Sequence, residues 1–291
     1  MQLFAGGQQL RTEESHFGLL SECAAAEAPQ RLEENGYAFM RDFFDREAVL
    51  AVRLEIAERL DAEGFLDPSF PIEQCVAKPG LNLTFRPDIS NASAALQRLI
   101  YSEGVIEFFS KTLGGEARHY DFTWLRVVAP GKGTFPHCDI VYMGRGTRNL
   151  LTMWVPYGDV PLSIGGLLIL ENSHKLLDLH QTYGRMDVDA ICQTDQNQTA
   201  FSGFQESGAI DKDFLGLQTR FGGRWLSADY RAGDALIFGM QTIHGSLDNG
   251  SCQIRLSSDS RYQLASEPAD ERWVGENPIA HGADAKRNLI C

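Results

Sequence analysis

From residue 118 onward, the sequence consists largely of short segments that are rich in β-branched and aromatic residues and bounded by Gly or Pro. This pattern is typical of β-strands. The segments are RHYDFTWLRVVAP, RNLLTMWVPYGDV, GGLLILENSH, DALIFGM and QIRLSSDSRYQLA. A series of short strands that follows a helical N-terminal half predicts a barrel or sandwich with helices covering one face.

The preceding part of the chain, about 21–113, is predicted to be mainly helical because its apolar residues recur at helical spacing and end at glycines. The expected elements are a helix over 21–36 that ends near Gly36, a strand over 37–44, a helix over 46–64 that Asp45 caps, a long loop over 66–90, and one or two helices over 92–113 broken near Gly104.

Residues 176–224 interrupt the strand-rich part with a polar, Gly- and Gln-containing stretch of little periodicity. A loop of this length inside a compact domain is usually functional or disordered. We interpret it as an insertion over the mouth of a barrel, in the position of a lid. The chain is therefore expected to form a single domain over 1–291, with a helical part at about 21–113 and a barrel core at about 118–264.

The composition argues against some classes of partner. Lys and Arg number 26 against 39 Asp and Glu, a formal charge of −13, and an acidic surface repels nucleic acid and anionic lipid. No apolar run is long enough to span a bilayer, no signal peptide is visible, and the six cysteines form no C-x-x-C pair. We expect a cytoplasmic protein with a small-molecule substrate, whose oligomeric state the sequence does not indicate.

The segment Pro136-His137-Cys138-Asp139 carries the first chemical signal. On a strand, positions i and i+2 share a face, so His137 and Asp139 are expected to present an imidazole and a carboxylate side by side, with Cys138 turned away. His244, at the end of DALIFGMQTIHG, fits as a third ligand. Two histidines and one carboxylate on one face of an octahedral ion are diagnostic of non-haem Fe(II) oxygenases.

Such a set of ligands leaves three coordination positions open. Two of them can accept a bidentate 2-oxo acid and the third can accept O2. Decarboxylation of the oxo acid would then supply an oxidant able to remove hydrogen from carbon, so the hard chemistry belongs to the metal and its cosubstrate.

Further residues suit a 2-oxoglutarate pocket. Arg255 lies at the start of the next strand, and a planar guanidinium can bind the distal carboxylate bidentately. Ser246 supplies a hydroxyl nearby, and Ser257 shares the strand face of Arg255. Thr152 and Trp154 share one face of RNLLTMWVPYGDV, where an inward tryptophan can form a wall of the pocket.

With these motifs in view, the chain resembles the phytanoyl-CoA dioxygenase family, a branch of the Fe(II)/2-oxoglutarate-dependent dioxygenases. The matching segments are PHCDIVYMGRGTRNLLTMWVPYGDVPLSIGGLLILENSHK and YRAGDALIFGMQTIHGSLDN followed by IRLSSDSRYQ. They cover about 118–175 and 227–264, with a weaker likeness in the N-terminal helices. The H-x-D, W-x-P-x-G-D-x-P, G-G-L-x-x-L-x-x-S-H and H-x-S…R-x-S elements together form a specific signature.

The resemblance implies a mainly β fold with α, a cupin-like double-stranded β-helix or jelly roll flanked by N-terminal helices, with iron at one open end. It implies Fe(II), 2-oxoglutarate and O2 as cofactor and cosubstrates. It carries over His137, Asp139 and His244 as iron ligands and catalytic residues, and Arg255, Ser246, Trp154, Thr152 and Ser257 as 2-oxoglutarate contacts. Halogenases of the family lack the acidic ligand, so the presence of Asp139 disfavours halogenation.

The predicted activity is hydroxylation, or a related oxidation, of a small organic substrate with release of succinate and CO2. Two alternatives stay open: a cupin-like metal enzyme that does not use 2-oxoglutarate, and a non-enzymatic barrel that binds a metal or ligand. The family accepts acyl-CoA thioesters among other substrates, but the acidic chain shows no Lys/Arg cluster for the phosphates of CoA.

Overall fold

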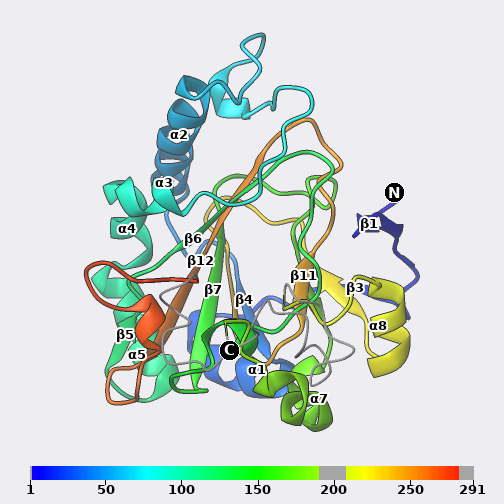
Figure 1. Ribbon diagram of the computed structural model, residues 1–291, viewed down its shortest axis with the longest axis vertical. Coiled ribbons are helices and arrows are strands. Elements are labelled where there is room, and N and C mark those ends of the chain that lie inside the picture. The colour runs from blue at the N-terminus through cyan, green and yellow to red at the C-terminus, as the bar shows by residue number, and fades with distance from the viewer. Residues whose placement is uncertain (1, 190–207, 282–291) are drawn as a thin grey trace.

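The computed structural model describes residues 2–189 and 208–281, and its strands form two larger, mainly antiparallel sheets and one short hairpin (Figure 1). The six-stranded sheet has the order β4-β10-β7-β12-β5, and β6 pairs with another part of β12. The four-stranded sheet has the order β11-β8-β9-β3, in which β3 and β9 run parallel. The strands are β1 (Phe4–Ala5), β2 (Gln8–Gln9), β3 (Phe17–Leu19), β4 (Tyr37–Met40), β5 (Ala117–His119), β6 (Trp124–Val128), β7 (Leu150–Pro156), β8 (Leu167–Leu170), β9 (Trp225–Ser227), β10 (Ala235–Gly239), β11 (His244–Ser246) and β12 (Arg255–Leu264).

The central strand β7 is buried along its whole length, and the side chains on its two faces pack against different parts of the core. Leu151, Met153 and Val155 join the apolar cluster that packs under the helices. Trp154 joins a second cluster between the two sheets, and Thr152 reaches a carboxylate on the same side. The expected alternation, with Thr152 and Trp154 on one face, is confirmed.

The core between the sheets is made by large apolar side chains from both. Phe39 of β4 and Phe238 of β10 come from the six-stranded sheet, and Ile169 of β8 and Leu226 of β9 come from the four-stranded sheet. All four are 3% exposed or less. Two sheets that face each other across such a core, with helices on one outer side, confirm the expected jelly-roll fold class.

Helices cover the outer face of the six-stranded sheet (Figure 1). In α2, the Asp45 side chain accepts a hydrogen bond of 2.8 Å from the backbone N–H of Ala48 and caps the helix, as the sequence predicts. Val52, Ile56 and Leu60 of α2 are buried against the sheet. The helices are α1 (Ala28–Asn35), α2 (Arg46–Ala62), α3 (Pro87–Ala92), α4 (Ala94–Ile100), α5 (Glu103–Leu113), α6 (Ile140–Met143), α7 (Leu177–Gln181) and α8 (Phe214–Phe221).

The structure divides several segments more finely than the sequence predicts. Two helices, α4 and α5, lie over 94–113, as expected, but the break between them falls at Tyr101 and Ser102, so that Gly104 lies in the first turn of α5. The expected long loop over 66–90 ends within α3. Segment 118–130 contains parts of two strands, β5 and β6. The short strands β3, β9 and β11 were not expected as separate elements.

The predicted insertion over 176–224 is described only at its two ends. Its first part contains α7 and its last part contains α8, so these ends are more regular than the sequence indicates. Tyr183 donates from its hydroxyl to the carbonyl oxygen of Gly208, which ties the two ends together. Residues 190–207 lie outside the described residues, and the prediction of a lid is not tested.

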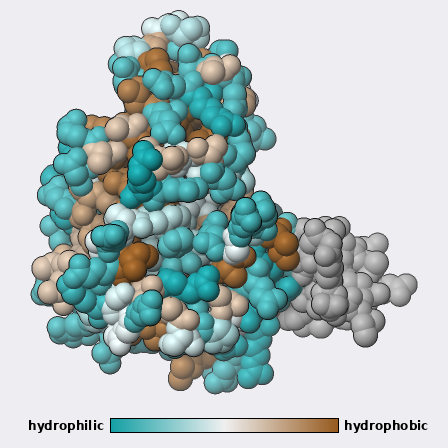
Figure 2. Space-filling model, turned by 90° about the vertical axis from the view of Figure 1, so that its left-hand side faces the viewer, coloured by the Kyte–Doolittle hydropathy of each residue, from teal (hydrophilic) through white to brown (hydrophobic). Residues whose placement is uncertain are grey.

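The face of the molecule in Figure 2 is largely hydrophilic, with hydrophobic residues scattered over it in small groups. In the described ranges, no helix combines the length and the apolar character that crossing a bilayer requires.

Candidate metal centre

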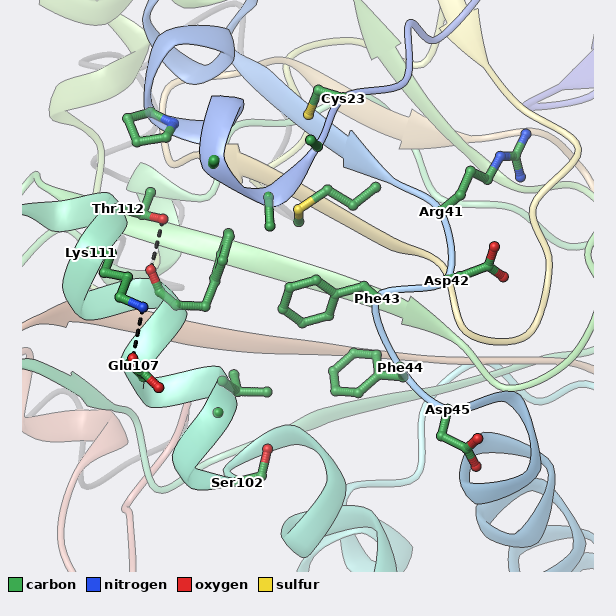
Figure 3. Close-up of a pocket in the computed structure, with 18 residues that line it drawn as sticks. Cys23, Arg41, Asp42, Phe43, Phe44, Asp45, Ser102, Glu107, Lys111 and Thr112 are labelled. Carbon is green, nitrogen blue, oxygen red and sulfur yellow. Dashed lines mark hydrogen bonds and ion pairs between the residues drawn. The ribbon is translucent and has the colours of Figure 1, made fainter.

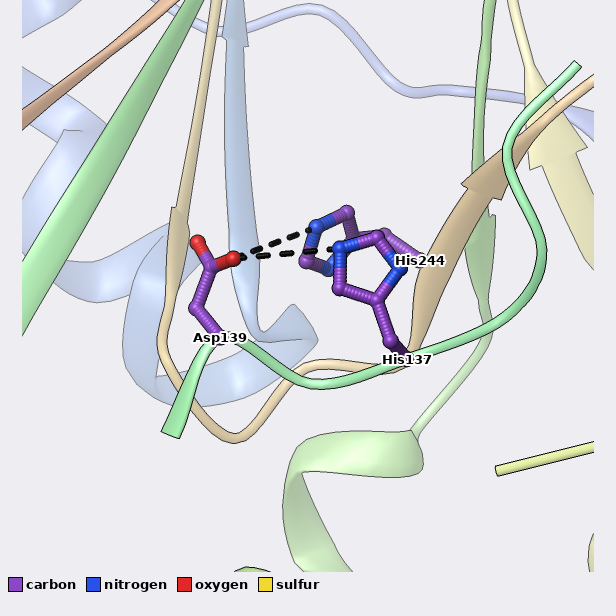
Figure 4. Close-up of side chains that lie close together, drawn as sticks. All are labelled: His137, Asp139 and His244. Atoms are coloured by element: carbon purple, nitrogen blue, oxygen red, sulfur yellow. Dashed lines mark ion pairs between the residues drawn. The ribbon is translucent and has the colours of Figure 1, made fainter. Parts of the chain in front are cut away.

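The two predicted histidine ligands lie directly opposite each other in an isolated antiparallel bridge. The backbone N–H of His137 donates to the carbonyl of His244 at 2.9 Å, and the N–H of His244 donates to the carbonyl of His137 at 3.0 Å. Opposite residues in such a pair project their side chains to the same face. The imidazole rings are therefore neighbours, with centroids 4.2 Å apart (Figure 4).

Asp139 completes the group, but not from a strand. It has helical backbone angles and is the N-cap residue of α6, so the expectation of a strand through 137–139 is wrong. The turn into α6 nevertheless directs Asp139 Oδ1 toward both rings, 3.9 Å from Nε2 of His137 and 3.7 Å from Nε2 of His244 (Figure 4). Cys138 points away, as expected, and its buried thiol donates to the carbonyl of Gln241.

In the described part of the chain, these three residues form the one group of His, Cys, Asp or Glu side chains with a metal-binding arrangement. One potential ligand atom from each lies within 4.8 Å of the others, and all three residues are buried. The structure therefore brings together the three side chains that the sequence singles out, from positions far apart in the chain.

Hydrogen bonds fix the tautomer of both imidazoles. Nδ1 of His137 lies 2.8 Å from the carbonyl oxygen of Phe135, and Nδ1 of His244 lies 3.0 Å from that of Thr242. A carbonyl only accepts, so each Nδ1 carries the proton and each Nε2 presents a lone pair toward Asp139. This is the form in which histidine binds a metal.

The environment also keeps the imidazoles uncharged. Burial, reinforced by the neighbouring His244, lowers the pKa of His137 to about 3. Burial likewise lowers the pKa of His244. Both rings are therefore neutral near pH 7, so no proton competes with a metal ion for their lone pairs.

Asp139 is held in its charged form by partners on its other oxygen. The Thr152 hydroxyl donates to Oδ2 at 2.5 Å, and the Arg261 guanidinium lies 3.0 Å from the same atom. Burial alone would raise the pKa of Asp139, but the charge of Arg261, the two neighbouring imidazoles and the hydrogen bond from Thr152 together outweigh it, and the pKa is well below its usual range. Oδ2 is thereby committed to these partners, and Oδ1 is left to face the two Nε2 atoms.

Three of the five residues predicted to contact 2-oxoglutarate line one inner cavity together with His137 and His244. They are Trp154, Ser246 and Arg255. The other two do not line it. Thr152 contacts Asp139 instead, and Ser257 is fully buried with a hydroxyl oxygen that has no hydrogen-bond partner.

Arg255 is a buried cation without a carboxylate partner in the described residues. It is 3% exposed, its NH1 donates to the carbonyl of Gly165, and its Nε has no partner. Burial, with the nearby charge of Arg126, lowers its pKa to about 10, so the guanidinium stays charged at neutral pH. A desolvated charge of this kind is costly unless an anion offsets it.

Glycine is required where the backbone approaches Arg255. Gly165 has φ +85°, and a Cβ atom there would lie 2.7 Å from the backbone oxygens of Leu247 and Asp248. Any other residue would therefore displace the carbonyl that accepts from Arg255.

A second, outer pocket of about 360 Å³ adjoins the centre and shares His137 and Arg126 with the inner cavity. Sequence reasoning did not single out Arg126, although an arginine within the apolar strand WLRVV is an available signal. Asp259 and Arg261, which lie two residues apart on β12, do not pair with each other. Arg126 binds Asp259 at 2.8 Å, and Arg261 binds Asp139.

A larger cavity, of about 870 Å³, lies elsewhere, between the β4–α2 connection, the start of α1 and α5 (Figure 3). Cys23, Phe43 and Phe108 are among its lining residues, and none of the predicted site residues is. Cavity size alone therefore does not identify the functional site of this protein.

Comparison with known proteins gives a consistent picture. The model of the phytanoyl-CoA dioxygenase family matches residues 32–257. A curated relative, 1-deoxypentalenic acid 11-beta-hydroxylase from Streptomyces exfoliatus, is 24% identical over 247 residues, which are 80% of this chain and 79% of the relative.

Solved structures share the fold. EctD from S. alaskensis with bound Fe superposes with a TM-score of 0.59 at 17% identity, covering 99% of this chain and 97% of that one. The epimerase SnoN from nogalamycin biosynthesis, in complex with Fe3+, alpha ketoglutarate and nogalamycin RO, gives 0.58 at 18% identity, covering 89% and 94%.

Proposed function

Since this chain belongs to the phytanoyl-CoA dioxygenase family, we propose that its iron ligands are His137, Asp139 and His244. The protein is an Fe(II)- and 2-oxoglutarate-dependent oxygenase, because the family has this activity and the His-Asp-His group is present. When bound, the iron with its oxo acid and O2 supplies an oxidant strong enough to attack a C–H bond.

The observation that carries the ligand assignment is the orientation of the three donor atoms. Two Nε2 lone pairs and Asp139 Oδ1 face one another, while Nδ1 of each histidine and Asp139 Oδ2 are occupied by the protein. Hydrogen bonds of this kind to the far side of each ligand fix its orientation and raise its affinity for a metal. The donor set fits Fe(II), and the neutral imidazoles need lose no proton to bind it.

We assign the distal carboxylate of 2-oxoglutarate to Arg255, with Ser246 and Trp154 as further contacts. The support is the buried Arg255 guanidinium, whose charge has no carboxylate partner in the described ranges. The inner cavity is narrow, about 20 Å³, so a five-carbon oxo acid would extend from Arg255 past His137 toward the outer pocket. In a metal enzyme that does not use an oxo acid, no cosubstrate carboxylate would offset the charge of this buried guanidinium.

The outer pocket is the proposed site of a small organic substrate. Its volume lies at the lower end of the range for small-molecule sites, and His137 and Asp139 form part of its wall. We propose hydroxylation as the reaction because the curated relative is a hydroxylase. Named structural neighbours include an epimerase and a carbocyclase, so the product must be identified directly.

A cytoplasmic location is part of the same proposal. Cys23, Cys75, Cys138 and Cys252 are free thiols, which is the usual state of cysteine in a reducing compartment.

The test is formation of succinate from 2-oxoglutarate with Fe(II) and O2. We expect His137→Ala and Asp139→Ala to abolish succinate formation, because each change removes one of three ligands. His16→Ala, whose half-buried side chain lines neither cavity, serves as the matched control and should retain full activity. Circular dichroism of each variant would confirm that it is folded, and turnover by either ligand variant at the wild-type rate would refute the assignment.

A further inference from the structure

The outer pocket contains two arginines whose hydrogen-bonding capacity is incompletely used. Its aromatic wall includes Phe85, Trp124 and Phe135, and its polar wall includes Arg126 and Arg261. A mainly apolar pocket usually contains a few polar groups that orient the ligand. What these two arginines can bind bears directly on the class of substrate, and the argument rests on the function proposed above.

Arg261 is almost completely buried, with 1% of its surface exposed. Its NH2 lies 3.0 Å from Asp139 Oδ2, and its carbon Cζ lies 4.4 Å from the ring centroid of Trp124. Its Nε and NH1 atoms are buried and have no hydrogen-bond partner. A guanidinium has five N–H donors, so Arg261 retains donors that Asp139 does not satisfy.

Arg126 lies closer to the open space. Its Nε donates to Asp259 at 2.8 Å, and the side chain is 26% exposed. Within residues 2–189 and 208–281, its two terminal nitrogens have no hydrogen-bond partner. They form the end of the guanidinium that binds carboxylates through two parallel hydrogen bonds. Arg126 also lines the inner cavity, so it lies between the proposed cosubstrate and the proposed substrate.

The charges around the two cavities leave a surplus of one positive charge. Arg126, Arg255 and Arg261 supply three positive charges, against two negative charges from Asp139 and Asp259. Fe(II) and the 2-oxoglutarate dianion would cancel each other. A single negative charge on the substrate would bring the site to neutrality, which matters because unbalanced charge is costly in a buried site.

We propose that the substrate is a monocarboxylate, whose carboxylate group is bound by the terminal nitrogens of Arg126. The positive charge of Arg261 adds to the attraction for this anion, and the aromatic wall contacts the apolar remainder of the molecule. A phosphate ester or a CoA thioester would bring more negative charge than the pocket balances. The arginine pair therefore selects for a small, singly charged acid.

The test compares matched acid and amide probes on the anaerobic enzyme loaded with Fe(II) and 2-oxoglutarate. Cyclohexanecarboxylate, 1-naphthoate and 2-naphthoate would each be paired with the neutral carboxamide of the same skeleton, and binding would be measured by calorimetry. We expect at least one acid to bind roughly tenfold or more tightly than its amide, because a charge-assisted bidentate contact contributes that much affinity.

Arg126→Gln should remove this preference while leaving the affinity for the amides unchanged. Loss of Arg126 leaves Asp259 with an unpaired charge, so the double variant Arg126→Gln/Asp259→Asn is the companion that keeps the site balanced if the single variant is unstable. Arg118→Gln, on β5 and 39% exposed by its side chain, is the matched control and should bind the probes as the wild type does.

The outcomes separate the possible roles of Arg126. Equal affinities for every acid and its amide, or no acid binding at millimolar concentration, would overturn the proposal. So would a loss of 2-oxoglutarate affinity in Arg126→Gln with the acid preference intact, since Arg126 would then serve the cosubstrate. If the wild type fails to bind Fe(II) and 2-oxoglutarate at all, the proposed function itself fails, which the loading step detects before any probe is added.

Discussion

At the scale of single residues, the centre depends on side chains that point away from the metal position as much as on those that face it. Asp139 shows this most clearly, because Thr152 and Arg261 both bind its Oδ2. Together they leave Oδ1 as the donor atom and hold the carboxylate in its ionised form. We therefore propose that Thr152 orients a metal ligand, whereas the sequence suggested a contact with the cosubstrate.

Replacement of Thr152 by Val tests this role with a side chain of nearly the same shape. We expect the affinity for Fe(II) to fall roughly tenfold or more, as is usual when a partner of a metal ligand is lost, while the KM for 2-oxoglutarate changes little. Thr219→Val, on the exposed face of α8, is the control. Anaerobic Fe(II) titration would measure the change, and an unaltered affinity would show that Arg261 alone is sufficient.

Replacement of Arg255 should have the opposite effect: it should change the KM for 2-oxoglutarate and not the affinity for Fe(II). Arg255→Ala should raise the KM for 2-oxoglutarate at least about tenfold, because it removes charge-assisted hydrogen bonds to a carboxylate, and should leave Fe(II) binding intact. Arg255→Lys keeps the charge without the planar fork and should fall between the two. Steady-state succinate formation at varied 2-oxoglutarate measures both, and an unchanged KM would remove Arg255 from the cosubstrate site.

Residue types and spacing in the sequence were sufficient to select His137, Asp139, His244 and Arg255, because a metal and a dicarboxylate demand particular chemistry. They were insufficient for Arg126 and Arg261. The partners of a buried arginine depend on which strands lie opposite it, and this is a property of the assembled sheets. Only the pairing of β6 with β12 places Arg126 against Asp259.

At the scale of elements, a buried arginine is one of the contacts that hold the segment over 265–281 against the rest of the molecule. Arg272, which is 2% exposed, binds Asp270, Asp187 and Asp189. Asp187 is also bound by Arg145 at 2.5 Å. His281 lines the outer pocket, so these ion pairs hold part of the pocket wall in place.

Acidification should release this segment. Burial raises the pKa of Asp187, but the hydrogen bond from Arg145 and the charge of Arg272 outweigh it, and the pKa is lowered overall. A carboxyl whose folded pKa is depressed contributes stability above its unfolded value, near pH 4, and this contribution is lost as the pH falls further. Hydrogen exchange of peptides over 265–281, corrected for intrinsic rates, should show loss of protection below about pH 4.

The variant Arg272→Met provides the matching experiment at neutral pH. It leaves three aspartates without their shared cation, so the same peptides should lose protection near pH 7. If protection in this variant equals that of the wild type, the apolar packing of Trp273, which is fully buried, holds the segment without help from the ion pairs.

At the scale of the whole molecule, periodicity and glycine positions were sufficient to predict a barrel or sandwich with a helical cover, because buried faces impose a repeat of two on strands and of about 3.6 on helices. The jelly roll itself was implied by the resemblance to a known family. The short strands β9 and β11 were not predicted from the sequence. β11 has three residues and β9 has three, too few to show a repeat, and each exists because a neighbouring strand offers it a partner.

Binding of the cofactors should stabilise the whole fold, because the ligands come from distant parts of the chain. Fe(II) at about 100 times its dissociation constant contributes about 2.7 kcal/mol, which corresponds to a rise of roughly 5 °C in Tm for a domain of this size. Anaerobic thermal unfolding with and without Fe(II) measures this rise. The rise should be absent in Asp139→Ala, and an equal rise in that variant would indicate that the ion binds elsewhere.

The paired backbones of His137 and His244 have a consequence for how this scaffold can change over evolutionary time. Since the distance between the imidazoles is fixed by two mutual hydrogen bonds, residues can be gained or lost in the loops of the long connection between them without altering the spacing of the rings. A single residue added next to either histidine, by contrast, would turn its ring to the opposite face of the sheet. Selectivity can thus diversify through insertions and deletions in the connecting segments, while oxidative chemistry is inherited unchanged.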